Sequence, residues 1–368
     1  MKVLIAAGGT AGHINSGLAI AQYIQSQQPQ AQVVFVGRRE GMEYSLVTKA
    51  GYGFRHMEVS GFQRRLSAEN IKRNLIALKN LALALPAAKK ILREEKPDLV
   101  IGTGGYVSGP IVRRAAKCGI KTAIHEQNAF PGVTNKLLSK VVDKVFIASE
   151  KAAKYMAHPD KCIVCGNPVR RQIQTADRAA ARASLGVEGK TVVLSFGGSL
   201  GAMAVNNAMK DLVLHNKDRQ DIVHFHVVGK YDDGDFESFL KENGLENSEN
   251  IKAFEYLYDI PSYMAAADII ISRCGALTIS EIACMGKASI LIPSPNVSEN
   301  HQYYNGKVLA DLGAAVLIEE KDLNKQSITR AFDSLYGDNG KIQSMGQKAR
   351  GAYQADCLDI IYSNLGLA

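Results

Sequence analysis

The sequence has no tryptophan, and its aromatic residues, 7% of 368, are scattered rather than interleaved with basic ones. Its lysines and arginines form no long block either. Both absences argue against a nucleic-acid partner. The net charge of +8 still favours a partner that carries negative charge. With 46% hydrophobic residues the chain can bury a sizeable core, and its length suits two domains.

Cysteine is scarce, and its pattern is uninformative. The six cysteines lack the spacing of a secreted disulfide scaffold, and the chain opens on an apolar strand instead of a signal peptide. These features predict a cytosolic protein. Cys162 and Cys165 have C-x-x-C spacing, but no second pair completes a zinc site, so we expect no metal or redox centre there.

Long apolar runs are absent too, because no stretch reaches the 18 residues of a membrane-spanning helix. Residues 61–97 come nearest, but Lys79, Asn80 and Pro86 interrupt them. This segment is rich in lysine and arginine, which predicts a basic amphipathic helix against an anionic membrane surface. An ordinary surface helix of an α/β domain is the alternative. The apolar face consists of Ile71, Leu75, Leu78, Ala82 and Leu85.

The dinucleotide-binding motif G-x-G-x-x-G is missing as well. A glycine loop, residues 8–13, follows the first predicted strand at residues 2–7, but its glycines do not have that spacing. The second strand, residues 32–36, ends in Gly37-Arg38-Arg39, without an acid for a ribose hydroxyl. NAD binding is therefore disfavoured. NADP binding through the two arginines stays open as a weaker alternative.

A repeated plan of strand, glycine loop and helix is what the sequence does contain. In the first half, glycine loops at residues 8–13 and 104–110 and a polar turn at 126–132 all follow predicted strands. In an open parallel sheet such loops line the edge where ligands bind. After a breaker-rich segment at 166–170, the plan restarts with a strand at 191–196 and a glycine loop at 197–201.

The chain therefore reads as two α/β domains facing across a cleft. We place the first at residues 1–165 and the second at 166–349. The last helical stretch is predicted at residues 343–364, and residues 350–368 are expected to pack back on the first domain.

Residues 272–281 form the most informative stretch. An apolar strand, 269–271, leads through Arg273-Cys274-Gly275 into a helix predicted from Ala276 to Met285 and ended by Gly286. The unpaired N–H groups at such a helix start attract anions. Thr278 and Ser280 would add hydroxyl donors for a phosphate, and Glu281 would accept from a ribose diol. The alternative is that the two hydroxyls cap the helix and Glu281 is a solvated acid.

Taken together, these motifs resemble those of the MurG family of bacterial glycosyltransferases, glycosyltransferase family 28. The resemblance implies a GT-B fold of two Rossmann-like, doubly wound parallel-sheet domains. It also implies inverting transfer of N-acetylglucosamine from UDP-N-acetylglucosamine to the 4-hydroxyl of lipid I, giving lipid II for peptidoglycan. No cofactor or metal is expected. The matching motifs lie at residues 8–13, 104–110, 125–128, 166–170, 197–202, 272–281 and 300–302.

The resemblance also implies a location and partners. It places the chain at the cytoplasmic face of the inner membrane as a peripheral protein, with other cell-wall or division proteins as further partners. Two features depart from the family pattern. Ala11 stands where glycine is common, and Asn15-Ser16 stand where an apolar residue and proline are frequent. Because a methyl group restricts positive φ, Ala11 puts the geometry of acceptor binding in question.

An inverting transfer needs one base to deprotonate the acceptor hydroxyl. His13 is our first choice, because a helix start favours a neutral histidine. His125 and Glu126 are the alternatives. For each of the three residues it also remains possible that the side chain only makes a structural hydrogen bond within its loop. Gly104, Gly105 and Tyr106 would lie on the acceptor side. The expected substrate-binding residues are Thr10, Ala11, Gly12, Asn128, Arg170, Ser199, Leu257, Ala276, Leu277, Thr278, Ile279, Ser280, Glu281 and Gln302.

Negative charge on the leaving diphosphate would be stabilised by backbone N–H groups, helix dipoles and Arg170 instead of a metal. We expect Asp232 and Asp233, which lie in a polar loop, to face solvent. Two other functions remain as alternatives. A UDP-sugar 2-epimerase shares the GT-B plan but would need carboxylates in the cleft. A non-catalytic nucleotide-sugar-binding scaffold would bind the donor without turnover.

Overall fold

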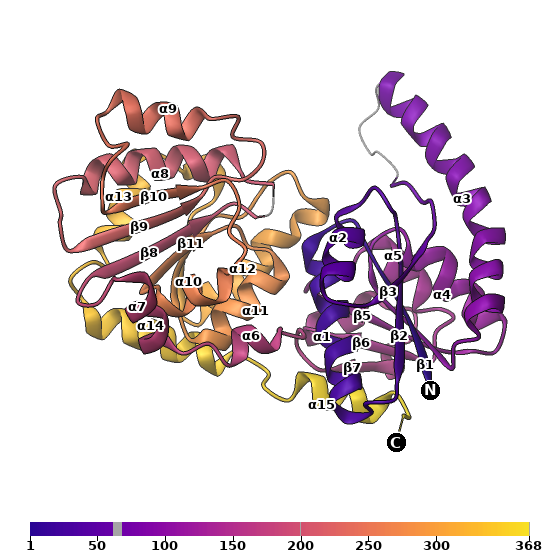
Figure 1. Cartoon of the computed structure of the whole chain (residues 1–368). Helices are drawn as coiled ribbons and strands as arrows, with labels where there is room; N and C mark the ends of the chain where they lie inside the picture. Colours follow the sequence, from indigo (N-terminus) through magenta and orange to yellow (C-terminus); the bar gives the residue numbers. More distant parts are fainter. Residues whose placement is uncertain (62–67, 199, 368) are drawn as a thin grey trace. The chain divides into compact units, whose positions relative to one another are not determined.

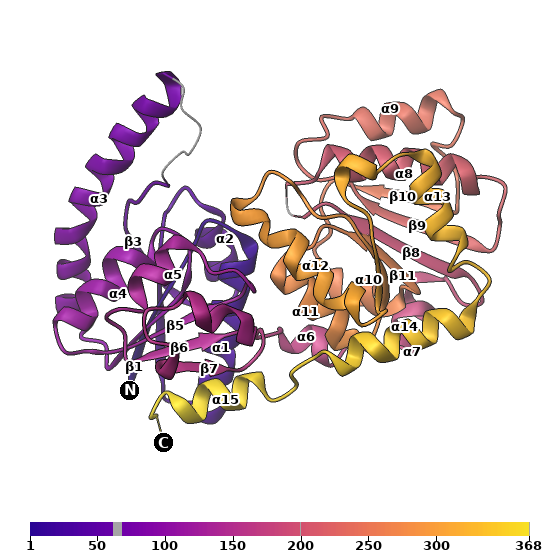
Figure 2. The same cartoon turned by 180° about the vertical axis from the view of Figure 1, so that it is seen from behind.

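The computed structural model describes residues 1–61, 68–198 and 200–367, without the side chains of residues 68–73, 78, 81 and 298. The chain forms two compact units, each shown in Figures 1 and 2. Unit 1 comprises Met1–Arg170 and Gln354–Ala368, and unit 2 comprises Arg171–Tyr353. Each unit is built on one parallel sheet between two layers of helices.

The sheet of unit 1 has seven strands in the order β3-β2-β1-β4-β5-β6-β7. Side chains along β1 alternate between its two faces. Val3 and Ile5 pack on one face, and Leu4 and Ala6 on the other. The strands are β1 (Lys2–Ala7), β2 (Gln32–Gly37), β3 (Gly53–His56), β4 (Leu99–Gly104), β5 (Lys121–Glu126), β6 (Lys144–Ile147) and β7 (Cys162–Val164).

Helices cover both faces of this sheet. One layer holds α1 (Ala11–Gln27), α2 (Met42–Lys49) and α15 (Cys357–Asn364). The opposite layer holds α3 (Ala68–Glu95), α4 (Ser108–Lys117) and α5 (Val133–Leu138). The 3-10 helices η1 (Glu150–Tyr155) and η2 (Pro159–Lys161) precede β7.

The C-terminal helix α15 lies against α1, as Figure 2 shows. The hydroxyl of Tyr23 on α1 donates to the carboxylate of Asp359, and its ring meets that of Tyr362 edge-on, with centroids 5.9 Å apart. The expectation of one helical stretch over residues 343–364 is wrong. The structure has two helices, α14 (Asn339–Gly351) and α15, because α14 ends at Gly351 and Asp356 begins the next helix.

The long helix α3 carries two apolar sides. Its inner side buries small residues such as Ala84 and Ala88 against the sheet, whereas Leu75 and Leu83 on its outer side are 64% and 56% exposed. Ala82 and Leu85, from the predicted apolar face, are exposed too. The side chains of Ile71 and Leu78 lie outside the described residues. Among the described helices, none is long and apolar enough to cross a bilayer.

The sheet of unit 2 has six strands in the order β10-β9-β8-β11-β12-β13. They are β8 (Thr191–Phe196), β9 (Ile222–Val227), β10 (Ile251–Phe254), β11 (Ile269–Ser272), β12 (Ala288–Leu291) and β13 (Ala315–Leu317). The helices are α6 (Arg171–Gln174), α7 (Arg178–Leu185), α8 (Met203–Asn216), α9 (Asp235–Glu242), α10 (Ile260–Ala266), α11 (Ala276–Met285), α12 (His301–Asp311), α13 (Lys325–Asp333) and α14, with η3 (Ser298–Asn300) and η4 (Glu320–Asp322).

Both sheets change direction beside their first strand. In unit 1, β1 lies between β2 and β4, and in unit 2, β8 lies between β9 and β11. In open parallel sheets ligands bind outside the carboxyl ends of the strands at such a switch point. The glycine loops after β1, β4, β8 and β11 all lie at these positions, so these loops are the candidate ligand-binding positions.

Strand β9 buries two histidines in the core of unit 2. Burial lowers the pKa of His224 to about 4 and that of His226 to about 3. In the unfolded chain both would titrate near 6.5, so the unfolded state binds more protons between these values. The contribution of the two histidines to the free energy of unfolding is therefore fully present above about pH 6.5. It is lost as the pH falls toward their pKa values in the folded state.

We expect each histidine to remove about 2 kcal/mol of the free energy of unfolding between pH 8 and pH 5. Urea unfolding followed by fluorescence of the tyrosines at both pH values measures this loss. His224→Gln should reduce the pH dependence by about half, whereas His158→Gln, an exposed histidine of unit 1, should leave it unchanged. A stability that is constant from pH 8 to pH 5 would contradict the argument.

Candidate active site

The loop between β1 and α1 holds Thr10, Ala11, Gly12 and His13. Thr10 N-caps α1, and its side-chain oxygen accepts a hydrogen bond of 3.4 Å from the backbone N–H of His13. The His13 ring folds back on the loop, with Nδ1 3.0 Å from the carbonyl oxygen of Gly8. Ala11 begins the helix, so its methyl group does not meet the positive φ that would strain it.

A second glycine loop, after β4, packs directly against the first. Gly104 and Gly105 both have positive φ, and neither position tolerates a side chain. A methyl group on Gly105 would lie 2.2 Å from the carbonyl oxygen of Gly8, and one on Gly104 would lie 2.6 Å from the His13 ring. The sequence-predicted residues His13, Gly104 and Gly105 are therefore in contact. Tyr106 follows them and is half exposed.

His13 has the properties of a neutral base. Burial lowers the pKa of its imidazole, and the Gly8 carbonyl and the nearby Glu126 oppose this shift only in part. A histidine that stays unprotonated at neutral pH can accept a proton from a hydroxyl. The threonine hydroxyl of Thr103 donates to the His13 carbonyl at 2.8 Å and fixes the backbone at this position.

Glu126 is fully engaged within its own loop. One carboxylate oxygen accepts from the backbone and side-chain amides of Asn128, at 2.9 and 3.0 Å. The other accepts from the backbone of Gly132 and the side chain of Asn135, at 3.0 and 2.9 Å. Four hydrogen bonds on a buried carboxylate organise the turn after β5.

His125 is also buried and held on both ring nitrogens. Gln127 lies 3.0 Å from its Nδ1, and the carbonyl oxygen of Gly166 lies 2.9 Å from its Nε2. Since the amide of Gln127 donates to Nδ1, the proton of a neutral ring sits on Nε2 and points at Gly166. Burial lowers the pKa of His125, but the Cys165 thiol and Gly166 raise it more, so the net shift is upward.

In unit 2 the site is built around the start of α11. The helix spans Ala276–Met285, as the sequence predicts, and ends at Gly286 in a left-handed conformation. Its N-cap, Gly275, contributes no side-chain hydrogen bond, and its first turn holds no acid. Such a helix start is suited to an anion. The Ser280 hydroxyl is used within the helix, where it donates to the Ala276 carbonyl at 3.1 Å.

Gln302, at the start of α12, ties three segments of this site together. Its side-chain oxygen accepts from the backbone N–H groups of Cys274 and Ser294, at 3.3 and 2.9 Å. Asn305, one turn later, donates to the carbonyl of Cys274 at 3.3 Å. The loops after β11 and β12 are therefore fixed to α12. Because the side-chain oxygen of Gln302 is used in this way, Gln302 can contact a ligand through its amide nitrogen.

Arg273 is a site-shaping residue that the sequence analysis did not assign. It contacts the carbonyl oxygens of Ile292 and Pro293, at 3.3 and 3.2 Å, and forms an ion pair of 2.6 Å with Glu320. Its position beside the predicted glycine loop was the available signal. Glu281 lies on the next turn of α11 and is only 8% exposed.

The loop after β8 repeats the glycine contact of unit 1. A methyl group on Gly201 would lie 2.2 Å from the carbonyl oxygen of Val228, so this loop packs closely on the end of β9. Ser199 lies outside the described residues. Leu257 is half-buried between Tyr256 and Tyr258, whose rings meet edge-on with centroids 4.7 Å apart.

Asp232 was expected to face solvent, but its side chain is partly buried, so this expectation is wrong; Asp233 is exposed. Asp232 accepts from the Asn206 side chain at 2.7 Å and from the Phe236 backbone at 2.9 Å, so its carboxylate organises the start of α9. In the described part of the chain, the group of side chains with metal-ligand spacing is His125, Cys165 and Cys357, buried in unit 1. Asn128 and Arg170 belong to unit 1 as well.

The two units match two models of one family. The Glycosyltransferase family 28 N-terminal domain matches residues 3–147, and the Glycosyltransferase family 28 C-terminal domain matches residues 192–359. A relative from Acetivibrio thermocellus, named UDP-N-acetylglucosamine--N-acetylmuramyl-(pentapeptide) pyrophosphoryl-undecaprenol N-acetylglucosamine transferase, is 40% identical over 98% of this chain and 96% of its own length. The chain belongs to glycosyltransferase family 28.

Other comparisons agree with this family. A relative of the same name from Ruminiclostridium cellulolyticum is 41% identical over 98% of both chains. The crystal structure of Acinetobacter baumannii MurG has a TM-score of 0.73 and 28% identity, and the likeness covers 99% of each chain. The predicted GT-B fold with two parallel-sheet α/β units is confirmed, and so is the resemblance to the MurG branch of family 28.

Proposed function

We propose that this family 28 enzyme transfers N-acetylglucosamine from UDP-N-acetylglucosamine to the 4-hydroxyl of the muramyl sugar of lipid I. The product would be lipid II, a precursor of peptidoglycan. The observation that carries the proposal is full-length similarity, 40% identity over 98% of the chain, to a transferase of that name. The start of α11, which is suited to an anion, and His13, whose pKa is lowered by burial, would supply the chemistry that this reaction needs.

The donor would bind at the switch point of unit 2. The α11 start would receive the diphosphate through the N–H groups of Ala276, Leu277 and Thr278, with Ile279 and Ser280 completing the first turns. Glu281 would accept from the ribose hydroxyls, and the Gln302 amide would donate to the transferred sugar. Leu257 would contact the uracil through its backbone.

Departure of UDP leaves negative charge on the diphosphate, and the protein must stabilise that charge. In the metal-independent mechanism that we propose, the dipole of α11 and its unpaired N–H groups do so, with help from Arg170.

His13 is the proposed general base, which would take the proton of the attacking hydroxyl. Gly104 and Gly105 leave room beside its ring, since any side chain there would collide with it or with Gly8. Glu126 and His125 are less suitable, because their polar atoms are committed to loop hydrogen bonds. Glu126 instead adds negative charge near His13, which favours the protonated imidazole formed during transfer.

A transfer assay tests the function as a whole. Labelled N-acetylglucosamine is supplied as its UDP derivative with a lipid I analogue, with and without excess chelator. We expect acceptor-dependent transfer that the chelator does not inhibit. Release of free epimerised sugar nucleotide would support a 2-epimerase, and donor binding without transfer would support a scaffold. Loss of transfer in chelator would contradict the metal-independent mechanism.

Replacing His13 should separate catalysis from binding. His13→Ala is expected to lower kcat by about 10² or more, the scale of lost base catalysis, while donor affinity stays within a few-fold. In the native enzyme kcat/KM should fall only below about pH 6.5, because burial lowers the pKa of this base. His158→Ala, which removes an exposed histidine of the same unit, is the control. Near-normal turnover of His13→Ala would remove His13 from this role.

We also propose that α3 holds the enzyme at the cytoplasmic face of the membrane, where lipid I is reached. Lysines on α3 flank its exposed leucines, which suits an anionic headgroup layer. Leu75→Glu with Leu83→Glu should reduce flotation with anionic vesicles by about ten-fold, because two charges would enter the interface. Leu312→Glu, which alters an exposed leucine of unit 2, is the matched control. Unchanged flotation of the double variant would refute this contact.

A further inference from the structure

Unit 2 contains a cavity of about 820 Å³ at the edge opposite to its glycine loops. Thr191, Asp268 and Lys287 line it, and these residues stand at the amino-terminal ends of β8, β11 and β12. The proposed donor site lies at the carboxyl ends of the same sheet. A four- to six-residue strand, roughly 13–20 Å, separates the two. The cavity is therefore distinct from the donor site, and its size is that of small-molecule pockets.

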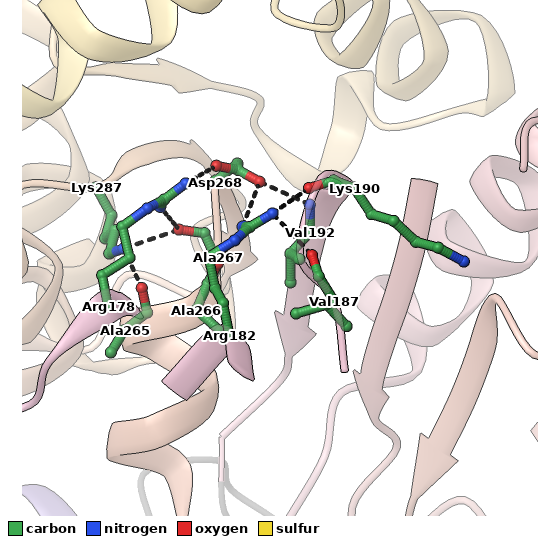
Figure 3. Close-up of polar contacts among 10 residues, drawn as sticks. All are labelled: Arg178, Arg182, Val187, Lys190, Val192, Ala265, Ala266, Ala267, Asp268 and Lys287. Atoms are coloured by element: carbon green, nitrogen blue, oxygen red, sulfur yellow. Dashed lines mark hydrogen bonds and ion pairs between the residues drawn. The ribbon is translucent and has the colours of Figure 1, made fainter. Parts of the chain in front are cut away.

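Positive charge dominates the lining. Four cationic side chains surround one carboxylate, that of Asp268, which gives a net charge of +3 when all are ionised. Figure 3 shows Arg178, Arg182 and Lys287 gathered around Asp268 and the carbonyls that precede it. Lys190 lines the cavity too, but its ammonium points away from Asp268 and donates to the side-chain oxygen of Asn250 at 3.1 Å. The four cationic residues are Arg178, Arg182, Lys287 and Arg350.

Some of these cationic side chains stabilise the fold. Lys287 donates to the carbonyls of Ala265 and Ala267, at 2.6 and 2.8 Å, and Arg182 donates to that of Ala266 at 2.9 Å. These carbonyls end α10, where the helix dipole attracts cations. Asp268 takes ion pairs from Arg178 and Arg182, at 2.5 and 3.1 Å. Arg350 takes no part in these contacts; its guanidinium lies over the Tyr353 ring, 5.5 Å from the centroid, and donates to the Cys284 sulfur at 3.8 Å.

The cluster is short of negative charge. Lys287 is only 7% exposed, and its pKa is lowered to about 7, first by burial and then by Arg178, whereas Asp268 opposes the shift and Arg182 adds to it. A bound anion would add to the countercharge that the single carboxylate of Asp268 provides for these cations.

The opposite wall is uncharged and polar. Asn339, Gln343 and Gln347 line the cavity and occur at four-residue spacing along α14, so they lie on one face of that helix. Amide side chains both donate and accept, as sugar hydroxyls require. Gly346 brings α14 close to the end of α11, since a methyl group there would lie 2.3 Å from the Gly286 carbonyl.

From this division of the lining we infer that the cavity is a second binding site, which takes a phosphorylated sugar. The phosphate would lie at the cationic wall of Arg178, Lys287 and Arg350, and the sugar hydroxyls would lie at the amide row of α14. This site goes beyond the transfer reaction, because neither the donor nor the acceptor is needed to occupy it.

Calorimetric titration of the full chain tests the inference. Glucose 6-phosphate, inorganic phosphate and glucose are titrated separately, each without UDP and with UDP in excess to fill the donor site. We expect glucose 6-phosphate to bind at least ten-fold more tightly than inorganic phosphate under both conditions, and glucose to show no binding. Equal affinity for the two phosphates would overturn the sugar class, binding that UDP abolishes would assign the ligand to the donor site, and no binding under either condition would refute the site.

Variants then locate the site. Arg350→Gln should weaken glucose 6-phosphate at least ten-fold, and Gln343→Leu with Gln347→Leu should weaken it without changing the affinity for inorganic phosphate. All three residues are exposed on α14 and lie outside the Asp268 ion pairs, so the fold should be retained, which thermal unfolding checks. Arg219→Gln, which removes another arginine of unit 2, is the control. Native affinity in both the single and the double variant would refute the site.

Discussion

Close backbone contact between glycine loops is the constraint on which the candidate site depends. In unit 1 the loop after β1 meets the loop after β4 at Gly8 and Gly105, and in unit 2 the loop after β8 meets the end of β9 at Gly201 and Gly229. At each contact an added methyl group would lie about 2.2 Å from a backbone atom. Only residues without Cβ allow these loops to lie side by side at the switch point, with the adjacent helix starts open toward a ligand.

This constraint sorts the polar residues near the loops into two groups. Glu126, Asp232 and Arg273 satisfy backbone or side-chain partners and keep the loops in place. His13 and the start of α11 differ from them, because their environment favours a neutral imidazole and an anion. A buried polar group that already has good partners loses free energy when it leaves them for a substrate. Catalysis is therefore better served by the second group.

Much of the fold could be predicted from the sequence. Strands β1, β8 and β11 and helix α11 follow from apolar runs bounded by glycine, and the restart of the pattern after residue 166 indicates two α/β units. Strand β3 was not predicted, because Gly53–His56 is a largely exposed edge strand without apolar alternation. The break between α14 and α15 was also missed, since the apolar pattern of residues 343–364 continues across it.

The side-chain partners at the site were harder to predict. The loops that carry His13, Glu126 and Gln302 could be located from their motifs, but their hydrogen bonds join residues distant in sequence, such as Gln302 and Cys274. No local pattern records such a pair. The same holds for the basic cavity, where Arg178, Asp268 and Lys287 come from three segments that meet only in the folded sheet.

Helix α11 connects these two charged regions of unit 2. Its first turn, at Ala276, faces the proposed diphosphate site, and its last residues, Met285 and Gly286, line the basic cavity. A ten-residue helix is about 15 Å long, so both regions lie within reach of one rigid element. The contact of Gly286 with Gly346 fixes the far end of this helix against α14. A ligand that moves α14 would therefore act on the helix whose other end is proposed to receive the donor diphosphate.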